Sequence, residues 1–420
     1  MIELPNYPVQ KVVLAYSGGL DTSCLLKLFL EKGIDVYTFT ADLGASEYGD
    51  QQLQAAKQKA LALGATDALV HDVKDEFAEE FVKYSLWANG AYQQHYPNST
   101  ALARPLVAKH LVQVAQEVGA DAVAHGCTGK GNDQLRFELA VNSLDPNLNV
   151  LAPIRDLQLS RDVEEQYAHH HGIPVSKKST YSVDANLWGR SIECGPLENP
   201  ATAPPDDAFE WVKPAQTAPD TPQTVKIHFE NGVPVQLQSE DLDVSGFLSV
   251  IQSLNALAGN HGVGVFDHVE DRVVGFKSRE VYECPAAAVL LKAHVDLEKM
   301  VLTKDELDFK HHADVTFGEK TFQGKWFSPL MASLKTYLAH TQAVVSGWVD
   351  VKLYKGHAQV IARDSPHSLH QHALATYTHG STFNQHFSEG FCKIYALQTV
   401  TANQVRTCGT TPDFKPLTYS

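Results

Sequence analysis

Long apolar runs are missing from this sequence. No uninterrupted apolar stretch reaches about 18 residues, the length that a membrane-spanning helix needs, so we expect no membrane partner. The first residues, MIELPN, carry no basic patch followed by an apolar core, so we expect no secretory signal peptide. The six cysteines are scattered and form no CxxC pair. Reduced thiols and a cytoplasmic location are therefore expected.

Positive charge is also scarce. Lys and Arg number 34 against 49 Asp and Glu, which gives a formal net charge of −15 at neutral pH. Because nonspecific binding to nucleic acid depends on basic residues that neutralise phosphates, we expect no nucleic-acid partner. A small anionic ligand is compatible with this charge, since backbone N–H groups helped by Mg²⁺ can hold phosphate within an acidic protein.

Recognisable metal-binding patterns are lacking as well. The histidines at residues 169–171 are adjacent, so they do not converge on one ion from a helix, and no HExxH motif accompanies them. His367, His370 and His372 have looser ligand-like spacing, but no cysteine or carboxylate set completes a tetrahedral site. We therefore predict no protein residues dedicated to a metal centre.

The composition of the 420 residues, 44% of them hydrophobic, indicates a globular protein of two or three domains. In the first domain, residues 1–172, short apolar segments alternate with helical ones. Strands are expected at 12–16, 35–40, 68–70, 121–124 and 149–152, and helices at 24–31, 51–63 and 104–118. This alternation predicts βαβ units and a buried parallel sheet, the α/β class. Ligands bind such sheets beyond the carboxyl ends of the strands.

The pattern changes after residue 172. Residues 196–222 are rich in Pro, Ala, Asp and Thr and are typical of a surface loop. Antiparallel strands and helices are expected at 225–229, 348–354, 247–258 and 285–302. We interpret residues 173–364 as a second, α+β domain. The tail, residues 365–420, has a weak helical pattern, and it either packs on a partner subunit or docks as a simple extension.

The strongest local signal is AYSGGLDTS at residues 15–23, between a buried strand and the start of a helix. Its glycines let the backbone approach a ligand closely, and the free N–H groups of the following helix favour an anion. An ordinary strand–turn–helix connection is the simpler alternative. No Walker A lysine follows, which argues against γ-phosphoryl transfer. The run resembles the PP-loop of the N-type ATP pyrophosphatases, in which the loop holds pyrophosphate while the substrate attacks the α-phosphate.

A second signal is AHGCTGKGNDQLRFE at residues 124–138, where three glycines and several polar groups follow a strand and open a helix. Asn132 and Arg136 are four residues apart and share a helix face, whereas Asp133 points about 100° away from Asn132. Such a set of groups is suited to positioning an amino acid. The alternative is a glycine-rich loop before a well-capped helix.

Two further polar segments carry no chemistry that the residues alone assign. YSVDANLWGRS at residues 181–191 is most simply a structural loop. The charged residues at 269–283 are most simply a solvated face.

Together these four segments resemble the argininosuccinate synthase family. The resemblance continues through ARPLVAKH at 103–110, HGVG at 261–264, KLYKG at 352–356 and EGF at 389–391, so it covers most of the chain. It implies an ATP-dependent ligation of citrulline to aspartate through a citrullyl-adenylate, with release of AMP and pyrophosphate. It also implies Mg²⁺ as cofactor and a homotetramer whose C-terminal tail serves oligomerisation.

The resemblance further implies three groups of site residues. ATP would be bound by Ala15, Tyr16, Ser17, Gly18, Gly19, Leu20, Asp21, Thr22, Ser23, Ala41 and Gly126. Aspartate would be bound by Thr128, Asn132 and Asp133. Citrulline would be bound by Tyr96, Ala101, Asn132, Arg136, Ser182, Ser191, Glu270 and Tyr282. We infer that Glu270 pairs with the citrulline α-ammonium and Arg136 with its α-carboxylate. Ala101 stands where many family members carry a serine.

Two other functions compete with this ligase. One is another PP-loop enzyme, such as a tRNA-modifying or amidating adenylase. Such enzymes often add a basic RNA surface, a Zn/Cys module or a glutaminase domain, and the net charge of −15 and the lack of a CxxC pair weigh against these. The other is a nucleotide-sensing protein without catalysis. Intact Ser17, Asp21, Asn132 and Asp133 argue against the second.

Overall fold

The computed structural model describes residues 2, 4–45, 49–174 and 180–412. The chain divides into two compact units, residues 1–367 and 368–420. The first begins with a parallel sheet of strand order β3-β2-β1-β4-β5. Its strands are β1 (Lys11–Ala15), β2 (Asp35–Asp42), β3 (Asp67–Asp72), β4 (Ala122–Ala124) and β5 (Asn149–Leu151). The predicted parallel sheet is confirmed. The order of connections reverses at β1, so the segments that follow β1 and β4 meet at the same edge.

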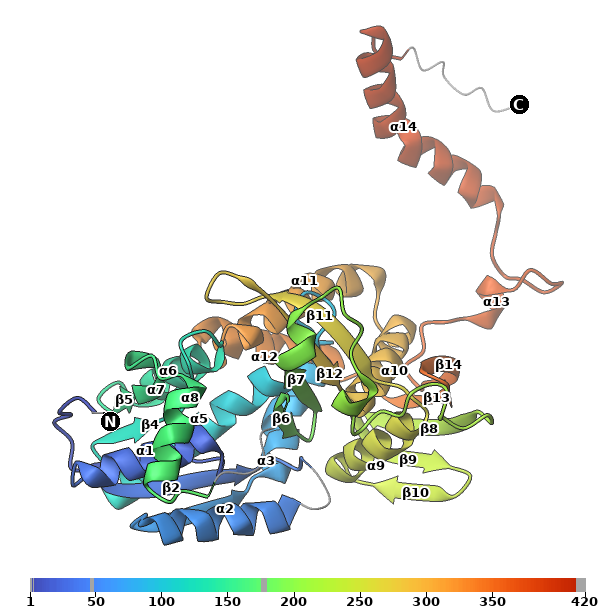
Figure 1. Cartoon of the computed structure of the whole chain (residues 1–420). Coiled ribbons are helices and arrows are strands. Elements are labelled where there is room, and N and C mark those ends of the chain that lie inside the picture. Colours follow the sequence, from blue (N-terminus) through green and yellow to red (C-terminus); the bar gives the residue numbers. More distant parts are fainter. Residues whose placement is uncertain (1, 3, 46–48, 175–179, 413–420) are drawn as a thin grey trace. The chain divides into compact units, whose positions relative to one another are not determined.

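Helices cover both faces of this sheet (Figure 1). Successive side chains of β1 point to opposite faces of the sheet. Val12 and Leu14 therefore pack in the core on one face, and Val13 packs in the core on the other. The first layer contains α1 (Leu20–Glu31), α2 (Gly49–Leu63), α7 (Pro153–Asp156) and α8 (Arg161–His170), and the second contains α5 (Ser99–Val118) and α6 (Asp133–Leu144). Burial on both faces explains why the central residues of β1, Val12, Val13 and Leu14, are all apolar.

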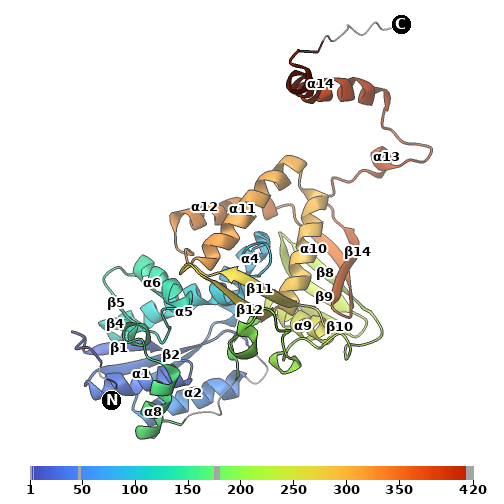
Figure 2. The same ribbon diagram turned by 45° about the horizontal axis from the view of Figure 1, so that its top comes forward.

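An antiparallel sheet lies apart from the parallel one within the first unit (Figure 2). Its order is β10-β9-β8-β13-β14, and Val225, Ile227 and Phe229 of β8 alternate inward as predicted. Its strands are β8 (Gln223–Glu230), β9 (Val233–Ser239), β10 (Leu242–Ser245), β13 (Gly347–Tyr354) and β14 (His357–Asp364); α9 (Phe247–Asn260) and α10 (Pro285–Val301) share its core.

A third sheet, of order β11-β12-β7-β6, contains both segments whose chemistry the sequence left open. The predictions of a loop at 181–191 and a solvated face at 269–283 were wrong. The strands are β6 (Ser182–Asn186), β7 (Gly189–Glu193), β11 (Val265–Asp271) and β12 (Lys277–Glu283). In β11 the buried positions are polar, His268 and Glu270, while Val269 is exposed. This inverted alternation hid the strand.

Residues 196–222 are irregular, with only two short 3₁₀ turns, η2 (Gly195–Glu198) and η3 (Asp206–Ala208), but they are not all at the surface. Val212 is buried, and its backbone N–H, like those of Glu210 and Trp211, donates to the fully buried carboxylate of Glu283. The segment therefore contributes to the core, which corrects the prediction of a simple surface loop.

Further helices fill the space between the sheets. They are α3 (Lys74–Phe77), α4 (Lys83–Trp87) joined to it by the π-turn η1 (Ala78–Val82), α11 (Lys304–Phe322) and α12 (Pro329–Gln342). The second unit contains α13 (His372–Ala375) and α14 (His386–Cys408), which confirms a helical tail. None of the helices within the described ranges is long and apolar enough to cross a membrane.

Candidate active site

A cavity of about 570 Å³ lies at the carboxyl ends of β1, β2 and β4. It brings together most of the residues predicted to bind ATP, although the segments that carry them are far apart in sequence. These are Ala15, Tyr16, Ser17, Gly19, Leu20, Asp21, Thr22, Ala41 and Gly126. Phe39 and Leu43 add an apolar wall beside Ala41. The cavity therefore combines a polar loop with an apolar side, as a nucleotide site requires.

The loop after β1 presents the start of α1 to this cavity. Gly19 is the N-cap residue, and its N–H donates to Ser17 Oγ at 3.3 Å. Ser17 Oγ also lies 3.3 Å from Thr22 Oγ1, which ties the loop to the first turn of the helix. The first N–H groups of a helix have no acceptor within the helix, so they favour an anion here.

Two predicted ATP residues, Gly18 and Ser23, do not line the cavity. Gly18 has φ +76°, and a Cβ placed on it would meet Ala56 Cβ of α2 at 3.0 Å. Glycine is required there by the turn and by α2 rather than by contact with the cavity. Ser23 is buried, and its hydroxyl lies 3.1 Å from Tyr16 Oη. Both residues support the loop from behind.

Three cations that the sequence analysis did not propose also line the cavity: Lys59 of α2, Arg104 of α5 and Arg161 of α8. Lys59 Nζ donates to the carbonyl oxygen of Gly18 at 2.8 Å, and burial lowers the pKa of this amine. Nothing in the polar sequence of α2 marks Lys59, because its place depends on how α2 packs against the loop.

A pair of acids sits beside these cations. Burial raises the pKa of Asp21, and burial together with Asp21 raises the pKa of Glu164 to about 8. Glu164 comes from α8 and is 3% exposed. Its Oε1 atom is buried without a hydrogen-bond partner among the residues that the structure describes.

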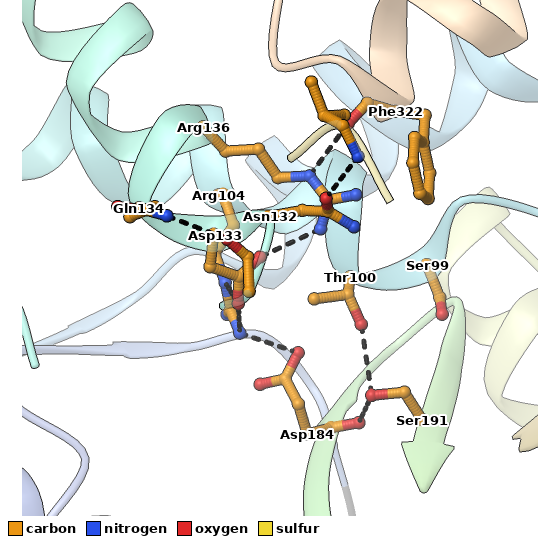
Figure 3. Close-up of polar contacts among 12 residues, drawn as sticks. Ser99, Thr100, Arg104, Asn132, Asp133, Gln134, Arg136, Asp184, Ser191 and Phe322 are labelled. Atoms are coloured by element: carbon orange, nitrogen blue, oxygen red, sulfur yellow. Dashed lines mark hydrogen bonds and ion pairs between the residues drawn. The ribbon is translucent and has the colours of Figure 1, made fainter. Parts of the chain in front are cut away.

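The other end of the site is a cluster of charges at the start of α6 (Figure 3). Asp133 Oδ2 accepts from Arg104 Nε at 2.9 Å, and Asp133 Oδ1 accepts from Arg136 Nη1 at 2.9 Å. Burial alone would raise the pKa of Asp133, but the two guanidinium groups lower it to about 2. Arg104 also forms an ion pair with Asp184 of β6, at 3.0 Å. Arg104 and Asp184 both line the cavity as well, so they connect the cavity with the Asp133 cluster.

Arg136 contacts the last residue of α11, and Asn132 contacts β11 and the turn that follows it. Arg136 is 4% exposed; its Nε donates to Phe322 O at 3.0 Å, and its guanidinium lies over the Phe322 ring. Asn132 Oδ1 accepts from Val273 N at 2.9 Å, and Asn132 Nδ2 lies 3.4 Å from Glu270 Oε1. Asn132 and Arg136 thus point to the same side of α6, as predicted, and both contact residues that follow position 265 in the chain.

The predicted citrulline residues Tyr96, Glu270 and Tyr282 form one buried group. The rings of Tyr96 and Tyr282 stack with centroids 3.7 Å apart, and Tyr282 Oη lies 2.6 Å from Glu270 Oε2. Tyr96 Oη accepts from Thr100 N at 2.9 Å. Thr100 Oγ1 in turn donates to Ser191 Oγ at 3.3 Å, which places Ser191 beside the group.

Three predicted residues have no recorded side-chain contact with these groups in the described part of the chain. Thr128 and Ser182 are exposed, and Ala101 is fully buried. Ala101 is the third residue of α5, a position whose backbone N–H has no acceptor within the helix. The backbone rather than the methyl group is what this position can offer to a ligand.

Comparison with known proteins decides the family. One family model, the arginosuccinate synthase N-terminal HUP domain, matches residues 11–174, and a second, the arginosuccinate synthase C-terminal domain, matches residues 181–402. The chain belongs to the argininosuccinate synthase family. The argininosuccinate synthase of Bacillus licheniformis is 50% identical over 392 residues, which cover 93% of this chain and 96% of that protein. Those of Geobacillus kaustophilus and Listeria monocytogenes are 50% and 46% identical, covering 93% and 94% of this chain and 95% and 97% of theirs.

Family membership confirms three predictions from the sequence: the family itself, the α/β class and ATP-dependent ligase activity. The match at residues 11–174 contains the loop at residues 15–23 together with Arg104, Asp133 and Arg136. The match at residues 181–402 contains Ser182, Ser191, Glu270 and Tyr282. The candidate site therefore contains residues from both segments that the family models match.

Proposed function

We propose that this cavity is where the protein ligates citrulline to aspartate, with ATP at the phosphate-loop end and both amino acids around Asp133, Glu270 and Tyr282. The observation that carries the proposal is the position of Arg104 and Asp184. Both line the nucleotide cavity, and Arg104 is also paired with Asp133. An α-phosphate and a ureido group bound at the two ends would therefore meet at Arg104.

The nucleotide would lie with its pyrophosphate on the loop at residues 15–23 and its adenosine near Ala41 and Gly126. The start of α1, Lys59 and Arg161 supply positive potential to that end. Gly18 and Ser23 act by holding the loop in shape. The absence of a Walker A lysine argues against γ-phosphoryl transfer and is compatible with attack at the α-phosphate.

Mg²⁺ fits beside Asp21. No group of three or more His, Cys, Asp or Glu side chains suited to a metal ion occurs in the described part of the chain. Mg²⁺ usually needs only one or two carboxylates, because substrate phosphates and water complete its shell. Asp21 lines the cavity and meets that need. The ion would neutralise charge on the departing pyrophosphate.

Citrulline would be held by opposite charges at its two ends. Glu270 pairs with its α-ammonium, Arg136 with its α-carboxylate, and the backbone N–H of Ala101 adds a donor. Tyr96, Ser182, Ser191, Tyr282 and Asn132 complete this site. Aspartate would be held by Thr128, Asn132 and Asp133. Since Asp133 already binds two guanidinium groups, it stays ionised and can accept from the aspartate amine.

The reaction then needs positioning more than covalent chemistry from the protein. The citrulline ureido oxygen attacks the α-phosphate and pyrophosphate leaves, which activates the ureido carbon. The aspartate amine attacks that carbon, and AMP leaves. Arg104 lines the cavity and would lie beside the α-phosphate, so its proposed role is to stabilise the negative charge that develops there.

The organisation of the chain follows from this assignment. We propose a nucleotide-binding domain at residues 1–172, a synthetase domain at 173–364 and an oligomerisation segment at 365–420. In α14 the side chains of Phe387, Phe391, Ile394 and Tyr395 are 63–77% exposed and share one face, which supports assembly into a homotetramer. We further propose that the enzyme works in the cytoplasm.

The decisive test is a pyrophosphate-release assay on the purified protein with ATP, Mg²⁺, citrulline and aspartate. Pyrophosphate should appear only when citrulline is present, and argininosuccinate only when aspartate is added as well. Pyrophosphate release that is indifferent to citrulline, or AMP formation that depends on tRNA, would overturn the proposal. Binding of ATP without any turnover of the amino-acid pair would favour a nucleotide sensor instead.

A further inference from the structure

Glu280 adds a second carboxylate to the group around Tyr282. Tyr282 Oη lies 2.6 Å from Glu270 Oε2 and 2.9 Å from Glu280 Oε2. Both separations are hydrogen-bond distances, but a phenol has one O–H and can donate only one bond. The second hydrogen bond therefore needs another proton. Within this group, that proton can only belong to Glu270 or Glu280, as a carboxylic acid O–H that donates to Tyr282 Oη.

The surrounding charges favour such a proton. Three carboxylates, those of Glu193, Glu270 and Glu280, gather around the guanidinium of Arg272. Arg272 Nη2 lies 2.6 Å from Glu193 Oε2 and 3.0 Å from Glu280 Oε1, so it is already shared. Glu270 is 1% exposed and the Glu280 side chain is 15% exposed, so water screens these charges poorly. Without a ligand, the group is short of positive charge.

The neighbours decide which carboxyl carries the proton. Burial raises the pKa of both carboxyls, but the hydrogen bond from Tyr282 and the guanidinium groups of Arg136 and Arg272 oppose that rise at Glu270. Burial, Glu270 and Glu193 raise the pKa of Glu280 to about 8. The remaining neighbour, Tyr96, is a phenol that burial keeps neutral. The proton thus belongs to Glu280, which donates to Tyr282 Oη while Tyr282 donates to Glu270.

We propose that Glu280 is a positioning residue of the citrulline site that stores one proton while the site is empty and releases it when the substrate's α-ammonium binds beside Glu270. This inference depends on the function proposed above. The exchange balances: an ammonium group brings one positive charge to the cluster, and the carboxyl of Glu280 loses one proton to solvent. The site can then hold the ammonium against two carboxylates without leaving either of them uncompensated.

The experiment is calorimetric titration of L-citrulline into the whole protein with α,β-methylene ATP, whose α–β bond cannot be cleaved. Runs in phosphate and in Tris at pH 7 separate proton release from binding, because the two buffers have different ionisation enthalpies. Wild-type protein should release about one proton per citrulline bound, and about fourfold less at pH 8.5, where Glu280 is mostly ionised before binding.

The matched variants are Glu280→Gln and Glu240→Gln. The amide introduced by Glu280→Gln keeps an N–H toward Tyr282 but has no proton to lose, so this variant should bind citrulline with the same enthalpy in both buffers. Glu240 is exposed in the turn between β9 and β10, and its variant should behave as wild type. Thermal unfolding checks that both variants fold; if Glu280→Gln does not, the pH series on the wild type decides.

The outcomes separate the two proposals. Absence of citrulline binding to wild type in either buffer would overturn the proposed function and this inference with it. Citrulline binding whose enthalpy does not depend on the buffer at pH 7 would overturn this inference alone. Unchanged proton release in Glu280→Gln would do the same, since the proton would then come from another group.

Discussion

At the scale of single residues, Arg104 is the side chain on which the two ends of the site depend. It is the guanidinium of α5 that lines the cavity, and it binds Asp133 and Asp184 at 2.8 and 3.0 Å. Its sequence context, a basic residue within an apolar helix, gave no reason to assign it a role. Only the approach of β6 and α6 to α5 places two carboxylates beside it.

We predict that Arg104→Gln lowers citrulline-dependent pyrophosphate release by about 10²–10³-fold, because removing one preorganised donor to developing charge costs that much in comparable sites. The control is Lys109→Gln, on the same helix and also paired with two carboxylates, Glu76 and Glu80, but outside the cavity lining. That variant should keep the wild-type rate within about twofold. A wild-type rate in Arg104→Gln would remove Arg104 from the reaction.

Other residues show how far sequence reasoning reached. The segment AYSGGLDTS predicted the loop and the helix that follows, because strand, glycines and cap are all local signals. It did not predict that Gly18 faces Ala56 or that Ser23 points into the core, because these facts depend on α2 and on the packing behind the loop. The roles of Thr128 and Ser182 remain predictions from the family resemblance.

At the scale of elements, apolar periodicity predicted the parallel sheet and the antiparallel strands β8 and β13. It did not find β6, β7, β11 and β12, although these strands carry Ser182, Ser191, Glu270 and Tyr282. Several of their buried positions are polar, among them Ser191 of β7 and Glu270 of β11, so alternation of apolar residues could not mark these strands. This is what we expect if the sheet faces the proposed citrulline site, because functional sites are where local sequence rules tend to fail.

Helix α11 allows a prediction about stability. Lys310 is 1% exposed and pairs with Glu298 at 3.0 Å and Asp314 at 2.8 Å. Lys310→Ala leaves two buried carboxylates without their cation, so we expect the free energy of unfolding to fall by about 3–5 kcal/mol. Chemical denaturation followed by circular dichroism measures this change.

The same helix offers the control. Lys304 and Asp308 form another pair four residues apart, but their side chains are 87% and 66% exposed. Lys304→Ala should therefore leave the denaturation midpoint unchanged within error. Equal midpoints for the two variants would mean that the buried pair contributes nothing to stability.

At the scale of the whole molecule, a negative net charge is compatible with binding of ATP, because basic side chains are concentrated at the cavity where its phosphates would lie. The net charge is −15, yet Lys59, Arg104 and Arg161 all line one cavity. The composition predicted no nucleic-acid partner, but it could not locate these three cations, which come from α2, α5 and α8.

The second unit sets the last prediction, which concerns assembly. Phe391 and Ile394 lie on the apolar face of α14 and are 63% and 73% exposed within the chain, so a homotetramer that covers this face would bury them. We expect the double variant Phe391→Glu, Ile394→Glu to shift the mass measured by light scattering after gel filtration from tetramer to smaller species. Asn403→Glu adds one negative charge about two and a half turns from Ile394, on the opposite side of α14 from that residue, and should leave the mass unchanged. A double variant that stays tetrameric would show that α14 is a docked tail, the alternative that its weak helical pattern left open, and that other surfaces hold the subunits together.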